Sequence, residues 1–128
     1  MRDELRMRYV GQTALVTGAS SGIGAEFAAR VAAMGADVVL VGRRQDALES
    51  LAAKIAADTG RRSITMPLDL AGEGAAHELN ARLNQLGVRV DILINCAGVG
   101  LTQDFVASTA DEITQQIRLN AVALTEVT

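Results

Sequence analysis

The sequence predicts an α/β protein built on a doubly wound parallel sheet, with helices on both faces of the sheet. Short runs of Val, Leu and Ile alternate four times with segments in which apolar residues recur every three or four positions. Hydrophobic residues make up 49% of the chain and aromatic residues only 2%, a composition that suits helices packed on a parallel sheet. Because such strands are joined by right-handed helical crossovers, we expect three layers, α/β/α, and a sheet cut short after about four strands.

Four short apolar segments are the predicted strands. They are rich in Val, Leu and Ile and are bounded by Gly, Asp or Pro. Pro67 belongs at the end of its strand, because proline cannot donate a hydrogen bond within a sheet. The four segments are residues 13–17, 37–42, 63–68 and 91–98.

Four helices are expected after these strands, each with apolar residues on one face. These residues are Ile23, Phe27, Val31 and Met34 in the first helix, Leu48, Leu51 and Ile55 in the second, Leu79, Leu83 and Leu86 in the third, and Ile113, Ile117 and Leu124 in the fourth. Gly35, Gly60 and Gly87 predict where the first three end. Thr109 and Glu112 have the spacing of a capping box and predict the start of the fourth.

Charge and cysteine content narrow the class of protein. The net charge is −3 and no cluster of basic and aromatic residues occurs, so we expect no nucleic-acid partner. Residues 1–10 mix Arg with acidic residues and read as an N-terminal extension, neither a signal nor a transit peptide, before one domain over 11–128. No apolar run could span a membrane. The single cysteine, Cys96, excludes an internal disulfide and a multi-cysteine metal site, and we expect a cytoplasmic protein without metal.

The stretch "TGASSGIG" at 17–24 stands where the first strand becomes the first helix. Gly18, Gly22 and Gly24 would let the backbone approach a phosphate, which would meet free N–H groups and the positive end of the helix dipole. No lysine follows the last glycine, so this is not an ATP-type phosphate loop. A tight strand–helix turn packed by small residues is the alternative, and the second strand–helix unit favours dinucleotide binding.

Arg43 and Arg44 follow the second strand, where a dinucleotide-binding fold holds the adenosine ribose. A carboxylate there would favour NAD(H), and an arginine would pair with the 2′-phosphate of NADP(H). No carboxylate occurs until Asp46, so we expect NADP(H) to be favoured over NAD(H). The alternative is that the two arginines form a solvated start of the second helix.

At this point the chain resembles the short-chain dehydrogenase/reductase family. The resemblance rests on "TGASSGIG" (17–24), "VGRR" (41–44), "DL" (69–70), "NCAG" (95–98) and "RLN" (118–120), in the order and at the intervals of that family. It covers the chain from about Val10 onward. It implies a Rossmann-type, NADP-binding domain over 11–128 and an oxidoreductase that transfers hydride between nicotinamide and a carbonyl or secondary alcohol.

The resemblance also implies which residues contact the cofactor. The glycine loop should hold the pyrophosphate and nearby ribose, and Arg43 the 2′-phosphate. Asp69 should accept from the adenine amino group. "NCAG" departs mildly from the family's usual "NNAG" or "NAG", and we read Cys96 as a core residue and not as a reactive thiol. The implied contacts are Gly18, Ser20, Ser21, Gly22, Ile23, Gly24, Arg43, Arg44, Asp69, Leu70, Asn95, Cys96, Ala97 and Gly98.

Asn120 is expected to share an apolar helix face with Ile113 and Ile117. A buried amide needs hydrogen-bond partners, and these could be backbone groups or water. The resemblance makes Asn120 the asparagine of the catalytic tetrad, which holds a water in the proton relay.

The family's other catalytic groups, a serine and a tyrosine four residues before a lysine, have no match. The only tyrosine is Tyr9 and the only lysine is Lys54, and His77 reads as a surface residue. We therefore expect an N-terminal, cofactor-binding half of a longer enzyme, inactive alone and prone to form homo-oligomers, whose full-length form acts on a small-molecule carbonyl or alcohol. The alternative is a non-catalytic nucleotide-binding or interaction module. A phospho-acceptor domain is set aside, because no acidic cluster follows the first strand.

Overall fold

The computed structural model describes residues 7–98 and 107–128. Its centre is a four-stranded sheet in the order β3-β2-β1-β4, and every neighbouring pair of strands is parallel. The chain lays β2 and β3 on one side of β1 and then returns to place β4 on the other. The strands are β1 (Thr13–Thr17), β2 (Asp37–Gly42), β3 (Ser63–Pro67) and β4 (Ile92–Asn95). This order confirms the predicted doubly wound sheet, although β4 is shorter than the predicted 91–98.

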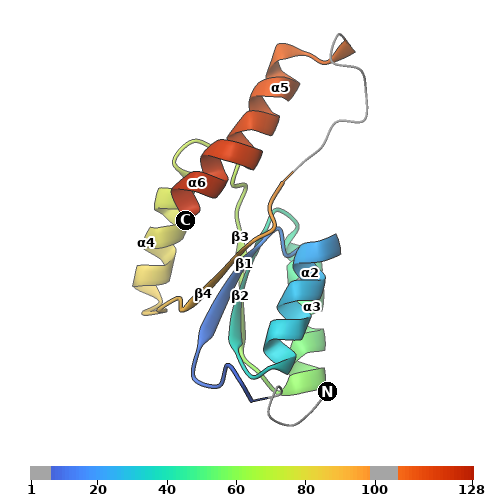
Figure 1. The fold of residues 1–128 in the computed structure, drawn as a ribbon, viewed down its shortest axis with the longest axis vertical. Helices are drawn as coiled ribbons and strands as arrows, with labels where there is room; N and C mark the ends of the chain where they lie inside the picture. The colour runs from blue at the N-terminus through green and yellow to red at the C-terminus, as the bar shows by residue number, and fades with distance from the viewer. Residues whose placement is uncertain (1–6, 99–106) are drawn as a thin grey trace.

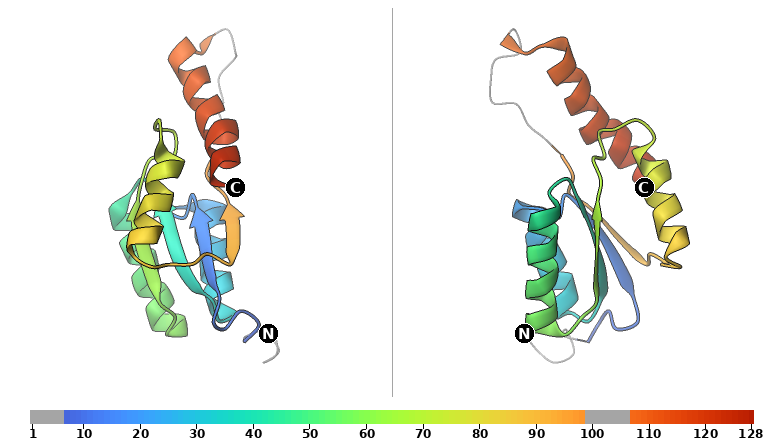
Figure 2. Two further views of the ribbon diagram at one scale, coloured as in Figure 1. Left: turned by 90° about the vertical axis from the view of Figure 1, so that its left-hand side faces the viewer. Right: turned by 180° about the vertical axis from the view of Figure 1, so that it is seen from behind.

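Helices cover both faces of the sheet, which confirms the three-layer prediction (Figure 1). Helices α2 (Gly22–Ala33) and α3 (Gln45–Thr59) pack side by side on one face. Helix α4 (Ala75–Gln85) lies on the other face, as the turned views in Figure 2 make clear. The last helical stretch consists of α5 (Ala110–Ile117), a π-helical segment η2 (Arg118–Ala123) and α6 (Leu124–Val127).

The core is split into two clusters by the sheet. On β1, Ala14 and Val16 face α2 and α3, whereas Leu15 belongs to the cluster beneath α4. Alternate residues of β2 divide in the same way, because successive side chains of a strand point to opposite faces. Both sets are buried, as expected for strands covered on both faces.

Helix α2 buries only part of the predicted face, since Val31 is buried but Ile23 and Phe27 are not. Its buried residues include Gly24, Ala28 and Ala32, which are spaced by four, whereas Ile23 is 72% and Phe27 48% exposed. These small residues let the helix backbone approach the strands closely, and the bulky side chains then point outward. The prediction that Ile23 and Phe27 belong to the buried face was wrong. Leu86, predicted in the apolar stripe of α4, is likewise 54% exposed.

The N-terminal residues contact the end of helix α2, whereas the last helical stretch extends beyond the sheet. Of the predicted extension 1–10, residues 7–10 are described, and the Tyr9 N–H donates to the Met34 carbonyl at 2.9 Å. Of the loop after β4, residues 99–106 lie outside the described part. Helix α5 then stands beyond the end of the sheet, with Ile117 55% exposed (Figure 1). The predicted capping box is confirmed at Thr109, whose hydroxyl accepts from the Glu112 N–H at 3.1 Å while the Glu112 carboxylate accepts from the Thr109 N–H at 2.7 Å.

Candidate nucleotide-binding site

A cavity of about 270 Å³ lies at the carboxyl ends of the strands. It gathers parts of the glycine loop and of the ends of β2, β3 and β4, with one residue from η2. The lining residues are Gly18, Ser20, Ser21, Ile23, Gly24, Gly42, Arg43, Leu68, Asp69, Leu70, Cys96, Ala97, Gly98 and Leu119. Most of the residues singled out from the sequence therefore converge on one space. Gly22, Arg44 and Asn95 were also singled out but are not among the lining residues.

The glycine loop packs so tightly at Gly18 and Gly24 that a side chain would not fit at either position. Gly18 has a φ of +65°, and a Cβ built on it would stand 2.6 Å from the Cys96 carbonyl oxygen. A Cβ on Gly24 would overlap the carbonyl group of Gly18. The loop can therefore close over the start of α2 only because both positions lack a Cβ.

The N-terminus of α2 faces this cavity without a cap of its own. Ser21 is the N-cap residue and makes no side-chain cap hydrogen bond, and the first turn contains no acidic residue. The first backbone N–H groups of the helix and the positive end of its dipole are therefore suited to an anion. A phosphate group placed there would supply the missing acceptors.

Thr17 joins the glycine loop to the fourth strand. It is 1% exposed, and its hydroxyl accepts from the N–H of Cys96 at 3.0 Å and from that of Ala97 at 3.1 Å. If the Thr17 hydroxyl were removed, the N–H groups of Cys96 and Ala97 would need another acceptor in a buried place. Sequence reasoning did not single out Thr17, although a polar residue at the end of an apolar strand, directly before the loop, was a usable signal.

The two arginines after β2 point to different places. Arg43 is exposed and lines the cavity. Arg44 is the N-cap residue of α3, and its Nη2 donates to the Ser20 carbonyl at 3.2 Å. Gly42, directly before them, lies against Ser20, since a Cβ there would stand 3.1 Å from the Ser20 Cβ. The sequence did not identify Gly42 as part of the site.

The end of β3 forms a turn that places Asp69 at the rim of the cavity. The Asp69 Oδ1 accepts from the Ala71 N–H at 3.0 Å, which fixes the carboxylate in the turn. Leu70 is 6% exposed and anchors the turn in the core beneath α4. Leu68 and Leu119 complete this wall and were not singled out as site residues, although Leu119 lies within the motif "RLN" at 118–120.

The end of β4 supplies the opposite wall. Cys96 is half-buried, and burial raises the pKa of its thiol, so the thiol is protonated at neutral pH. The Asn95 side chain donates to the Thr128 hydroxyl at 3.0 Å and so ties β4 to the end of α6. Asn95 therefore borders the site from outside the cavity.

Asn120 is exposed, and the prediction that it shares a buried apolar face was wrong. It lies in η2, and the face predicted for it is not buried in α5 either, where Ile117 is 55% exposed. In η2, Leu119 is buried, at 8% exposure. The Asn120 Oδ1 nevertheless approaches the site, at 3.1 Å from where a Cβ on Gly98 would stand.

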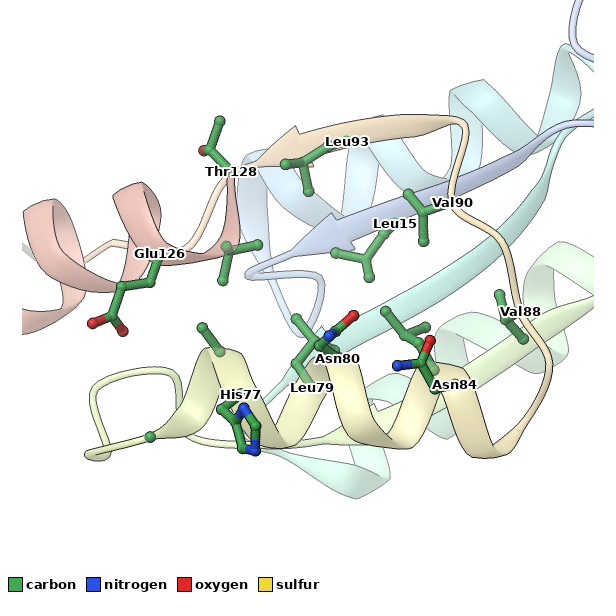
Figure 3. Close-up of a pocket in the computed structure, with 14 residues that line it drawn as sticks. Leu15, His77, Leu79, Asn80, Asn84, Val88, Val90, Leu93, Glu126 and Thr128 are labelled. Atoms are coloured by element: carbon green, nitrogen blue, oxygen red, sulfur yellow. The ribbon is translucent and has the colours of Figure 1, made fainter.

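A second, larger cavity of about 840 Å³ lies on the sheet face beside α4 (Figure 3). Leu15, Val90 and Leu93 line it from the strand side, and Leu79 and Asn80 line it from α4. None of its lining residues comes from the glycine loop or from the arginine pair. It is an incompletely covered part of the core, and we place the candidate site in the smaller cavity.

The described ranges, 7–98 and 107–128, contain neither a membrane-spanning helix nor a metal-binding cluster. No helix in them is long and apolar enough to cross a bilayer. No group of three or more His, Cys, Asp or Glu residues is placed to hold a metal ion there. His77 is exposed on α4, as the sequence predicted.

Comparison with known proteins gives consistent matches. The family model described as short chain dehydrogenase matches residues 12–128. Among curated proteins, the chain is 47% identical over 93 residues to a fatty acyl-CoA reductase of Acinetobacter baylyi, covering 73% of this chain and 31% of the relative. It is 38% identical over 122 residues to a very-long-chain 3-oxoacyl-CoA reductase of Phaeosphaeria nodorum, covering 92% and 36%. The chain thus spans about a third of the length of these relatives.

Solved structures match over nearly the whole chain. A short-chain dehydrogenase from Sphingobium yanoikuyae in complex with NADPH has a TM-score of 0.84 and 40% identity, covering 91% of this chain and 45% of that one. A 3-oxoacyl (acyl-carrier-protein) reductase from Agrobacterium tumefaciens with NADP bound has a TM-score of 0.87 and 31% identity, covering 99% and 48%. The described fold therefore corresponds to just under half of each of these chains.

Proposed function

This chain belongs to the short-chain dehydrogenase family, a family of oxidoreductases, and we propose that its smaller cavity binds NADP(H). The proposed reaction is hydride transfer between the nicotinamide ring and a carbonyl or secondary alcohol of a small molecule. The observation that carries the proposal is the convergence of the glycine loop, Arg43, Asp69 and the end of β4 on one cavity. Association with a second copy of the chain remains part of this proposal.

The glycine loop fits a dinucleotide on structural grounds. Neighbouring backbone atoms leave no room for a Cβ on Gly18 or Gly24, and the uncapped start of α2 offers backbone N–H groups. We assign the pyrophosphate to this place, because a negative group there would satisfy donors that otherwise face solvent. Ser20, Ser21 and Ile23 would border the adjoining ribose.

Arg43 is the proposed determinant of NADP(H) preference. Its guanidinium is exposed at the cavity and can form two parallel hydrogen bonds to a phosphate. No carboxylate lies at 41–45 to accept from the free ribose hydroxyls of NAD(H). The NADPH and NADP in two similar structures support this preference. Asp69 and Leu70 would then border the adenine.

The bound cofactor would supply the hydride, and the residues of this chain would bind and orient it. Asn120 lies beside Gly98 at the end of β4, and we propose that its amide holds a water for the proton relay. Tyr9 is followed four residues later by Thr13, so the tyrosine–lysine pair that the resemblance implies is not assigned here. A non-catalytic nucleotide-binding module is the second candidate, and this same observation permits it.

Calorimetric titration of the chain with NADP⁺ and with NAD⁺ tests the binding proposal. We expect saturable binding with NADP⁺ preferred by at least about tenfold, which corresponds to about 1.4 kcal/mol. Arg43→Ala should abolish this preference and leave NAD⁺ affinity unchanged, and Arg62→Ala, remote from the cavity, is the matched control. Equal affinities in the unmodified chain, or no binding, would contradict the proposal. We also expect no NADPH oxidation with a set of ketones from the 128 residues alone, and measurable oxidation would contradict that expectation.

A further inference from the structure

Arg43 and Arg44 are adjacent and carry the same charge, but the structure gives them different surroundings. Arg43 lines the nucleotide cavity. Arg44 does not, and its Nη2 donates to the carbonyl of Ser20, a residue 24 positions earlier in the chain. The contact therefore joins the turn after β2 to the middle of the glycine loop.

The Ser20 carbonyl belongs to the same peptide group as the N–H of Ser21, the N-cap residue of α2. In a trans peptide the C=O and the following N–H point in opposite directions. The carbonyl of Ser20 is directed at Arg44, outside the cavity, so the N–H of Ser21 is directed the other way. Ser21 lines the cavity and is the N-cap of α2. Fixing the carbonyl thus also fixes the direction of an N–H at the anion-binding end of the helix.

The neighbouring contacts limit how the loop could move. The Ala19 N–H donates to the Val41 carbonyl at 3.0 Å, which fixes the loop to β2 directly before Ser20. Ser20 also lies against Gly42, so the loop rests on the last residue of β2. Arg44 adds a third contact, through its hydrogen bond to the Ser20 carbonyl.

We propose that Arg44 is a positioning residue, which raises affinity for the dinucleotide by holding the Ser20 carbonyl and makes no contact with the nucleotide itself. The inference deepens the proposed function and rests on it. The two arginines then have separable roles, with Arg43 reading the 2′-phosphate and Arg44 ordering the loop that receives the pyrophosphate. Because NADP(H) and NAD(H) share that pyrophosphate, loss of Arg44 lowers affinity for both.

The first test compares affinities. Arg44→Ala should weaken NADP⁺ and NAD⁺ by the same factor, about three- to tenfold for one charge-assisted hydrogen bond at an exposed site. Arg44→Lys keeps a donor and should restore part of the loss. Arg43→Ala is the matched control and should weaken NADP⁺ alone. A loss confined to NADP⁺ in Arg44→Ala would show direct contact with the 2′-phosphate and overturn the proposal.

The second test needs no ligand and so separates this proposal from the proposed function. Amide hydrogen exchange of the free chain should be faster at residues 19–23 in Arg44→Ala than in the unmodified chain, and unchanged there in Arg43→Ala. Urea unfolding of each variant checks that the sheet remains intact. Unchanged exchange at 19–23 in Arg44→Ala would overturn the positioning role. Absence of nucleotide binding in the unmodified chain, with faster exchange in Arg44→Ala, would refute the proposed function and leave the loop contact standing.

Discussion

At the scale of single residues, the site depends on contacts that only one residue type can make. The backbone of Gly18 lies against the backbone of Cys96 and Ala97, and neither of these can move as a flexible side chain could. The glycine is therefore required twice, by its positive φ and by the space that its missing Cβ leaves.

Gly18→Ala tests this double requirement, and Gly60→Ala is its matched control. Gly60 has nearly the same φ, +68°, but a Cβ there would meet nothing within 4 Å. We expect Gly60→Ala to lower the free energy of unfolding by about 1 kcal/mol through backbone strain alone. Gly18→Ala should add an overpacking cost of about 1–3 kcal/mol and abolish nucleotide binding. Urea unfolding measures both, and equal losses would refute the close packing.

Some residues of the site were predictable and others were not, for physical reasons. The glycine loop and Arg43 carry local signals, because a loop between strand and helix needs a particular backbone. Ile23 and Phe27 misled the prediction, since hydrophobic periodicity does not tell whether small or bulky residues face the sheet. Thr17 carries a local signal, as a polar residue at the end of an apolar strand, but its bonds to Cys96 and Ala97 depend on a distant segment. The burial of Leu119 also depends on distant segments.

At the scale of elements, part of the last helical stretch could be predicted from the local sequence and part could not. Its start was predicted, because Thr109 and Glu112 satisfy each other's backbone N–H groups and need nothing else. The π-helical segment Arg118–Ala123 was not predicted, since a regular period was assumed through it. Asn120 was expected to be buried with Ile113 and Ile117, but no residue of α5 is buried. The structure exposes Asn120 and buries Leu119 in its place.

Thr109→Ala tests how much α5 relies on its cap. The substitution should weaken the helix by about 1 kcal/mol, because the Glu112 N–H loses its acceptor. Since α5 stands beyond the sheet, we expect faster amide exchange over 110–117 without a change in urea unfolding of the sheet. Thr114→Ala is the control, being the same substitution in the interior of α5, and should not speed exchange. A loss of sheet stability in Thr109→Ala would mean that α5 is more closely coupled to the core.

At the scale of the whole molecule, the alternation of strand and helix was enough to predict the parallel sheet and its layers. It could not predict how completely the helices cover each face. Helices α2 and α3 together cover one face of the sheet. Helix α4 covers only part of the other face, and the 840 Å³ cavity lies beside it. Of the two cavities described above, the smaller one gathers the sequence motifs. The central claim of this account is that the dinucleotide enters that one.

The most direct test is a titration of ¹⁵N-labelled chain with NADP⁺, followed by backbone amide chemical shifts. The account predicts that the largest shift changes fall at residues 18–24, 42–43, 69–70 and 95–98, with little change at Asn80 and Val90 of the larger cavity. Shift changes centred on Asn80 and Val90, or spread evenly over the sheet, would contradict it.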